Sequence, residues 1–286
     1  MNGIDISIKG WDDGEYVEQK LEETDRWVIH TADEVSITLG GATIKLKQQP
    51  KALNATRMGV GACLWEGELL LAAYLCAQPT YRYIGANVIE LGSGPGLVGL
   101  LLAKIGAKCL ITDIAKVLPL IRDNVEFNDL AVERLGSGSA AVEELEWGSP
   151  GYVSEVRRLA LAKYDYVLAA DCCYIDNEGA SPSTAHFIRT CAMLVSGGSP
   201  KCRCLVSFEL RAAAVKATFL SEAARRFRKV LRVPVAQLPR GCQVEHIELY
   251  ELSDVITEGD LDGSEEIGVV GELAGGGLLE TGEGME

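Results

Sequence analysis

The sequence predicts an α/β fold of the doubly wound type: a mostly parallel, seven-stranded sheet with an antiparallel last strand, preceded by an N-terminal β-hairpin. Two observations predict this fold. After residue 86, short apolar segments alternate with segments of helical periodicity, which is the order of repeated βαβ units. The last two apolar segments are joined by a loop instead of a helix, and this favours an antiparallel pair.

Seven apolar segments are the expected strands, and five segments between or after them are the expected helices. The strands are 87–91, 108–113, 139–147, 164–171, 202–210, 229–235 and 242–252. The helices are 97–105, 117–130, 152–162, 183–195 and 212–227. Ligands of such sheets bind beyond the carboxyl ends of the strands, so residues that follow a strand are the candidates for function.

Two further elements are expected before the sheet. Residues 36–47, "SITLGGATIKLK", predict a hairpin around Gly40 and Gly41, because apolar residues alternate on both sides of the glycine pair. Residues 61–78 predict an apolar helix that covers the sheet. The expected organisation is therefore an N-terminal extension (1–34), a main domain (35–254) and a C-terminal tail (255–286).

Composition favours a globular protein of the cytoplasm. The chain has 286 residues, of which 48% are hydrophobic, and this is enough for one large core or two small ones. No stretch approaches the roughly 18–20 apolar residues of a membrane span, and residues 1–16 lack the features of a signal peptide. Nine cysteines, an odd number, favour reduced thiols over a disulfide framework.

The net charge of −14 is concentrated at the C-terminus. Residues 255–286 hold nine acidic residues, nine glycines and no Lys or Arg, so the rest of the chain carries 32 acids against 27 bases. Such a tail is expected to be disordered, and either to keep the protein soluble or to hold a basic protein partner. The sequence has no basic patch with interleaved aromatic residues, so nothing in it suggests a nucleic-acid ligand.

Two pairs of neighbouring cysteines are candidates for metal ligands. Cys172–Cys173 and Cys202/Cys204 lack the CxxC spacing of a zinc site, and the chain has only three histidines. We therefore expect no metal site and interpret these cysteines as small apolar residues of strands.

The strongest functional signal is the stretch "VIELGSGPGLVG" at residues 88–99. Gly92, Gly94 and Gly96 follow an expected strand, and such a turn can wrap a nucleotide-like ligand, although a tight turn without a ligand has the same spacing. Leu97 stands where the dinucleotide fingerprint GxGxxG has its third glycine, which counts against NAD. Asp113, 21 residues after Gly92, is placed for a ribose contact, although it could also cap the next helix.

The segment "ELGSGPGLVG" resembles the cofactor loop of seven-strand S-adenosylmethionine-dependent methyltransferases. Together with "GACLWEGELLLAAYL", "ITDIAKVLPLIRDNVEFN", "LEWG" and "AADCCY", it makes residues 35–252 similar to the methyltransferase-like group of protein lysine methyltransferases, which modify chaperones and translation factors. The resemblance implies a Rossmann-like fold, S-adenosyl-L-methionine as cofactor and a protein lysine as acceptor. Pro95 departs from the family pattern and removes one backbone donor from the loop.

The resemblance also implies roles for individual residues. A pocket for the methionine part of the cofactor would be shaped by four residues: Glu90, Gly92, Gly94 and Gly96. Asp113 would accept hydrogen bonds from the ribose, and Trp147 would lie near the adenine. Trp65 would help to close the site, although core packing explains this tryptophan almost as well.

The D-x-x-Y motif places Asp171 and Tyr174 at the mouth of the site, beside the cofactor. Asp171 would anchor the incoming lysine and also border the cofactor, and Tyr174 would line the lysine channel. The lysine must lose a proton before it can attack, because its usual pKa is near 10.4. Glu209 and Arg211 lie at the same rim, where they steer the substrate or pair with each other.

Three functions stay open at this point: a protein lysine methyltransferase, a small-molecule methyltransferase on the same fold, and a catalytically silent module that recruits a partner through its acidic tail. The first is preferred, with a protein substrate, no nucleic-acid or membrane partner and a monomeric state. Histidine as the acceptor, and more than one methyl group per residue, stay open as well.

Overall fold

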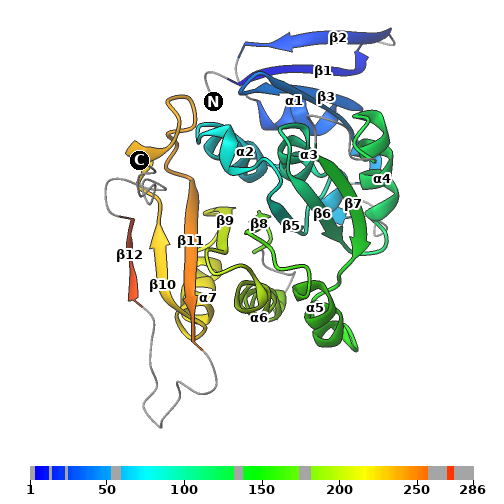
Figure 1. Ribbon diagram of the computed structural model, residues 1–286. Helices are drawn as coiled ribbons and strands as arrows, with labels where there is room; N and C mark the ends of the chain where they lie inside the picture. The colour runs from blue at the N-terminus through cyan, green and yellow to red at the C-terminus, as the bar shows by residue number, and fades with distance from the viewer. Residues whose placement is uncertain are drawn as a thin grey trace, which may run out of the picture.

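The computed structural model describes residues 4–12, 15–22, 25–52, 59–131, 138–173, 182–256 and 269–273. Its centre is an eight-stranded sheet in the order β12-β10-β11-β9-β8-β5-β6-β7 (Figure 1). The strands are β5 (Asn87–Leu91), β6 (Lys108–Asp113), β7 (Ser139–Glu144), β8 (Tyr166–Ala170), β9 (Arg203–Glu209), β10 (Phe227–Arg232), β11 (Ile247–Val255) and β12 (Val269–Glu272).

The directions of the strands confirm the predicted doubly wound sheet. β7, β6, β5, β8 and β9 are parallel neighbours, and β11 runs antiparallel to both β9 and β10. The two last predicted strands thus pair as expected; the final one, β11, lies next to β9, and β10 lies between β11 and β12. The order reverses between β5 and β8, so the carboxyl end of β5 faces the crevice where ligands of such folds bind.

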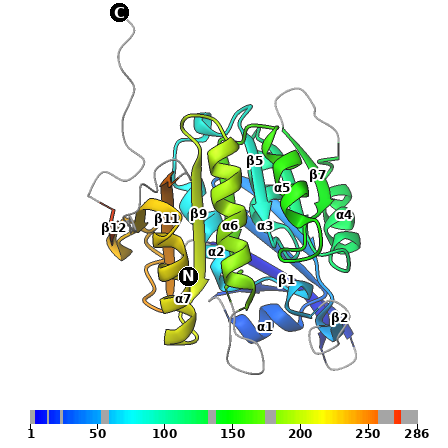
Figure 2. The ribbon, with the colours of Figure 1, turned by 90° about the horizontal axis from the view of Figure 1, so that it is seen from below.

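Helices cover both faces of this sheet (Figure 2). One face carries α2 (Glu66–Cys76), α3 (Leu97–Lys104) and α4 (Leu118–Phe127), and the other carries α5 (Tyr152–Ala160), α6 (Pro182–Gly197) and α7 (Ala213–Ala224). α2 is apolar nearly all round because it is covered twice, by the sheet below and by the N-terminal strands above. Two separate buried clusters result, one on each side of the central sheet.

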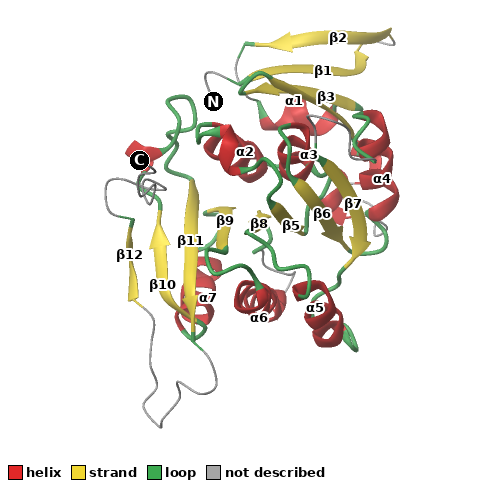
Figure 3. Cartoon of the chain, in the orientation of Figure 1, coloured by secondary structure: helices red, strands yellow, loops and turns green. Residues whose placement is uncertain are grey.

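A second, antiparallel sheet in the order β2-β1-β3-β4 lies over α2, α3 and α4 (Figure 3). Its strands are β1 (Asp5–Asp12), β2 (Glu15–Leu21), β3 (Glu34–Leu39) and β4 (Ala42–Lys47), and α1 (Arg26–Thr31) lies between β2 and β3. The predicted hairpin is present as β3 and β4. Residues of the expected extension, 1–34, add β1 and β2 to this sheet, and Ile6 of β1 and Ile29 of α1 join the buried cluster of the main domain.

Asn124 of α4 and the C-cap residue of this helix, Asn128, bind the backbone of β4. Asn124 and Asn128 each accept an N–H and donate to a C=O of the strand, at Lys47 and Lys45, over 2.7–3.1 Å. Asn124 also donates to the carbonyl of Pro95 over 2.9 Å. The N-x-x-x-N spacing places both amides on one side of the helix, so this motif fastens the N-terminal sheet and the glycine turn to α4.

The C-terminal region differs in one part from the expected disordered tail. Val269–Glu272 form β12, which pairs in parallel with β10, and Glu272 pairs with Arg232. Of the tail, residues 257–268 and 274–286 lie outside the described residues. No helix in the described part of the chain is long and apolar enough to cross a membrane.

Candidate active site at the carboxyl ends of the strands

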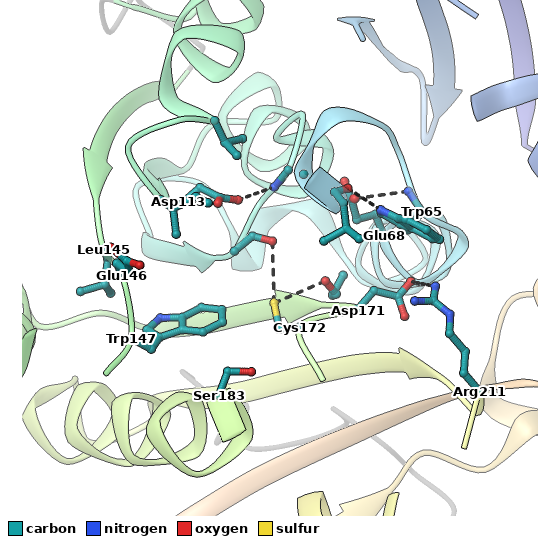
Figure 4. Close-up of a pocket in the computed structure, with 17 residues that line it drawn as sticks. Trp65, Glu68, Asp113, Leu145, Glu146, Trp147, Asp171, Cys172, Ser183 and Arg211 are labelled. Atoms are coloured by element: carbon teal, nitrogen blue, oxygen red, sulfur yellow. Dashed lines mark hydrogen bonds and ion pairs between the residues drawn. The ribbon is translucent and has the colours of Figure 1, made fainter. Parts of the chain in front are cut away.

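A cavity of about 260 Å³ opens at the carboxyl ends of β5, β6 and β8 (Figure 4). This volume is close to the lower end of the roughly 300–1,000 Å³ that small-molecule sites enclose. Six of the predicted site residues line it: Trp65, Gly92, Gly94, Asp113, Trp147 and Asp171. Figure 4 shows Trp147 on one side of the cavity and Trp65 and Glu68 on the other.

The glycine turn forms the floor of this cavity, and its glycines differ in what they require. Gly92 has φ +58°, and a Cβ there would lie 2.8 Å from Cys172 Sγ and 2.8 Å from Trp147 Cη2. Gly94 has φ +53°, but a Cβ there would meet nothing closer than 3.5 Å. Gly92 therefore permits close packing within the protein, whereas Gly94 leaves room for a ligand.

Glu90 and Gly96 lie beside the turn without lining the cavity. Gly96 is the N-cap of α3 with φ +92°. Glu90 is buried, and its Oε2 accepts the N–H of Gly99 over 2.8 Å. Burial raises the pKa of Glu90 to about 8, against the effect of its hydrogen bonds to the backbone of α3. Both residues thus position the start of α3, and through it the turn.

Asp113 ends β6 and holds the turn directly. Its Oδ2 accepts the N–H of Gly94 over 2.9 Å, and its Oδ1 accepts the N–H of Ile114 over 2.7 Å. Burial raises its pKa to about 6, although both hydrogen bonds favour the charged form. Each carboxylate oxygen has a second lone pair, so this side chain can also accept hydrogen bonds from a ligand in the cavity.

Trp147 follows β7 and forms one wall. Its ring packs on Phe187 of α6 with the ring centroids 5.0 Å apart. Its Nε1 is buried and has no hydrogen-bond partner among the described residues. A buried indole N–H usually finds an acceptor, so this donor is an exception; the wall itself offers a flat apolar face.

Trp65 is the N-cap residue of α2 and stands on the opposite wall. Its Nε1 donates to the carbonyl of Val60 over 2.8 Å, and its ring packs edge-on against His30. The guanidinium of Arg211 lies over the ring, 4.4 Å from the centroid. Both interpretations of Trp65, core packing and closure of the site, are therefore compatible with its position, because it packs against the core and also lines the cavity.

Asp171 comes directly after β8 with φ +53°, a conformation that costs energy in residues other than glycine and is least costly for Asp and Asn. Its carboxylate accepts the N–H groups of Gly67 over 3.1 Å and Glu209 over 2.8 Å, and Arg211 Nη2 lies 3.9 Å from Oδ2. Burial raises its pKa although Arg211 and both hydrogen bonds oppose the shift. Tyr174, the other residue of the D-x-x-Y motif, lies outside the described residues.

The acidic and basic residues at the rim form a network. Arg211 pairs with Glu209 over 2.9 Å, and Arg26 of α1 binds both Glu209 and Glu66 over 2.8 and 2.7 Å. Glu209 and Arg211 thus pair with each other, as one of the two sequence interpretations held. α1 reaches this rim only through the fold, which is why the sequence did not place Arg26 here.

The cavity also contains residues that no sequence motif indicated, and Glu68 is the most notable. Glu68 lies on the first turn of α2, is only 3% exposed, and lines the cavity. The signal was present, because Glu68 is an acid that begins the otherwise apolar run "ELLLAAYL". Among the described residues, no group of His, Cys, Asp or Glu is arranged to hold a metal ion.

Comparison with known proteins agrees with this geometry. A family model described as lysine methyltransferase matches residues 45–226. Protein N-lysine methyltransferase METTL21A of mouse is 31% identical over 135 residues, which are 47% of this chain and 56% of that protein. EEF1A lysine methyltransferase 3 of mouse is 37% identical over 121 residues, which are 42% of this chain and 47% of that protein. The chain thus spans about half the length of these curated relatives.

A solved structure shows the same fold. The 16S rRNA N2 G1207 methyltransferase of T. thermophilus, in complex with AdoMet and guanosine, superposes with a TM-score of 0.51 over 87% of this chain and 58% of that one. Its sequence identity of 15% carries no argument beyond the fold. The family model, in contrast, covers well over half of the chain, and with it strands β5 to β9, the glycine turn and the residues that line the cavity. The chain belongs to the lysine methyltransferase family.

Proposed function

We propose that this protein is an S-adenosylmethionine-dependent protein-lysine N-methyltransferase. The observation that carries the proposal is the cavity at the carboxyl end of β5, which joins the glycine turn to an acid at the end of β6 and another at the end of β8. Membership of the lysine methyltransferase family supports it, as do the names of the two mouse relatives.

The residues of the cavity fit S-adenosylmethionine. Trp147 offers a flat apolar face, Asp113 offers acceptor lone pairs, and Gly94 leaves space over the backbone. Acidic side chains suit the net positive charge of this cofactor. When bound, the cofactor supplies a methyl group on a sulfonium; the protein supplies orientation and electrostatics.

The side of the cavity at Asp171 fits an incoming lysine. A lysine side chain needs an anchor for its charged end and a route for the proton that it loses before it can act as a nucleophile. Asp171 is held rigidly by two backbone N–H groups, and the face of Trp65 beside it already attracts one cation, Arg211. Burial raises the pKa of Asp171, so this carboxylate is a stronger base than an exposed one and can hold the lysine proton.

The test is to incubate the purified protein with radiolabelled S-adenosylmethionine and a cell extract, and to map any labelled protein by mass spectrometry. A discrete band with a methylated lysine supports the proposal, and a methylated histidine would change the acceptor. If S-adenosylhomocysteine binds in calorimetry but no protein is labelled, a small-molecule substrate or a silent binding module explains the site better. Asp171→Asn, incubated in parallel, serves as the control for label that does not depend on this site.

We further propose that the protein acts as a cytoplasmic monomer on a protein substrate, such as a chaperone or a translation factor. All nine cysteines are free in the structure, and eight of them are buried, which suits a reducing compartment. Gel filtration combined with light scattering tests the monomeric state, and microscopy of a tagged protein tests the location.

A further inference from the structure

We propose that Glu68 is the counter-charge for an ammonium group, and that together with the carbonyl oxygens of Gly61 and Cys63 it forms the seat for the amino-acid end of the bound cofactor. This inference rests on the proposed function, because it assigns one part of that ligand to one part of the cavity. It gives a role to a buried carboxyl that the glycine turn, Asp113 and Asp171 leave unexplained.

The geometry consists of three acceptor oxygens that converge over Gly94. A Cβ on Gly94 would lie 3.5 Å from Glu68 Oε1 and 3.8 Å from each of the carbonyl oxygens of Gly61 and Cys63. The N–H of Gly94 points instead to Asp113. An ammonium has three N–H donors and no acceptor, so a space bordered by three acceptors matches it and would repel a carboxylate.

Within the described part of the chain, the carboxyl of Glu68 is only partly satisfied. Its Oε2 is buried and makes no hydrogen bond among the described residues, while its Oε1 accepts only a long one, 3.3 Å, from the N–H of Trp65. Burial raises its pKa well above the usual range, and the nearby carboxyls of Glu90, Asp171 and Asp113 raise it further. A buried carboxyl in such surroundings is costly unless a cation joins it, and a cationic ligand would remove that cost.

A purely structural role for Glu68 is the alternative. At the third position of α2 its side chain binds back to the N-cap N–H, which is half of a capping box. Glu68→Gln separates the two roles, because glutamine keeps the length and the acceptor for this cap but loses the charge. A cap alone would therefore leave ligand binding unchanged in Glu68→Gln.

The experiment is isothermal titration calorimetry of the full chain with three probes. S-adenosylhomocysteine and S-adenosylmethionine both carry the ammonium, and 5′-methylthioadenosine lacks the amino-acid part. We expect Glu68→Gln to weaken binding of the first two by about 10- to 100-fold, the range for a hydrogen bond to a charged group. Binding of 5′-methylthioadenosine, measured by displacement if its heat is small, is expected to change by less than about twofold.

Glu251→Gln is the matched control, because Glu251 is another buried carboxyl, on β11, that does not line the cavity. Unchanged affinity for S-adenosylhomocysteine in Glu68→Gln overturns the proposal, as does an equal loss for all three probes or a loss confined to S-adenosylmethionine. If Glu68→Gln unfolds, Glu68→Met is measured with the same probes; because methionine also removes the cap acceptor, only a loss confined to the two probes that carry the ammonium supports the proposal. Wild-type protein that binds none of the probes would contradict the proposed function itself, and this outcome is distinct from the others.

Discussion

Gly92 and Gly94 lie two residues apart, yet the structure predicts that alanine harms the protein at these positions in different ways. At Gly92 the new methyl group would approach Cys172 Sγ and Trp147 Cη2 to 2.8 Å. Cys172 is buried and its thiol contacts the carbonyl of Leu91, so it has no room to move. At Gly94 the nearest atom is 3.5 Å away, which is an ordinary contact distance.

The cost of Gly92→Ala has two parts. A left-handed backbone costs a residue other than glycine about 1–2 kcal/mol, and overpacking of a close-packed site adds about 1–3 kcal/mol. We therefore expect the free energy of unfolding to fall by about 2–5 kcal/mol, measured by urea denaturation without ligand. Gly151→Ala is the control, because Gly151 has φ +85° and nothing within 4 Å of a Cβ, so only the backbone part applies.

Gly94→Ala is expected to resemble Gly151→Ala in stability but to lose affinity for S-adenosylhomocysteine, because its methyl group would enter the ligand space. The reasoning is refuted if Gly92→Ala costs no more than Gly151→Ala. It is equally refuted if Gly94→Ala binds S-adenosylhomocysteine as tightly as the wild type does.

Three further results are expected. Asp171→Asn turns an amide NH₂ toward a backbone N–H, so the free energy of unfolding should fall by about 1–3 kcal/mol. The rate of methyl transfer should fall by about 100-fold or more, and single-turnover rates comparable to wild type would contradict the role of Asp171. Burial raises the pKa of Asp113 to about 6, and ligand donors would lower that pKa. Binding below pH 6 then releases a proton from Asp113, so this group should weaken the affinity for S-adenosylhomocysteine as the pH drops below 6, by at most about tenfold per pH unit. In calorimetry, Asp113→Asn should lose this part of the pH dependence. Truncation after residue 256 removes β12, whose valines are largely exposed and whose Glu272 forms a surface ion pair with Arg232. We therefore expect the free energy of unfolding to fall by only about 1–2 kcal/mol. Thermal melts with no change would show that β12 adds nothing to stability.

The order of strands and helices could be predicted because each element carries its own signal. The alternation of apolar and helical segments after residue 86 gave the parallel strands within a few residues, and the loop-joined last pair gave the antiparallel strand. The glycine turn could also be found locally, because its three glycines lie at every second position of one short segment. In the structure all three adopt positive φ. Such features depend on neighbours in the chain, and those are visible in a sequence.

Contacts between distant segments were decided by the tertiary structure alone. Glu68 appears in the sequence as an acid in an apolar helix, and only folding places it over Gly94, opposite Trp147. Likewise Glu90, expected in the pocket, turns inward to α3, because its side chain reaches the N–H of Gly99. The sequence alone determined which main elements form between residues 36 and 255 and in what order, but not β1, β2, α1 and β12. Which carboxyls face the cavity depended on side-chain direction and burial, because both are set by packing between elements far apart in the chain.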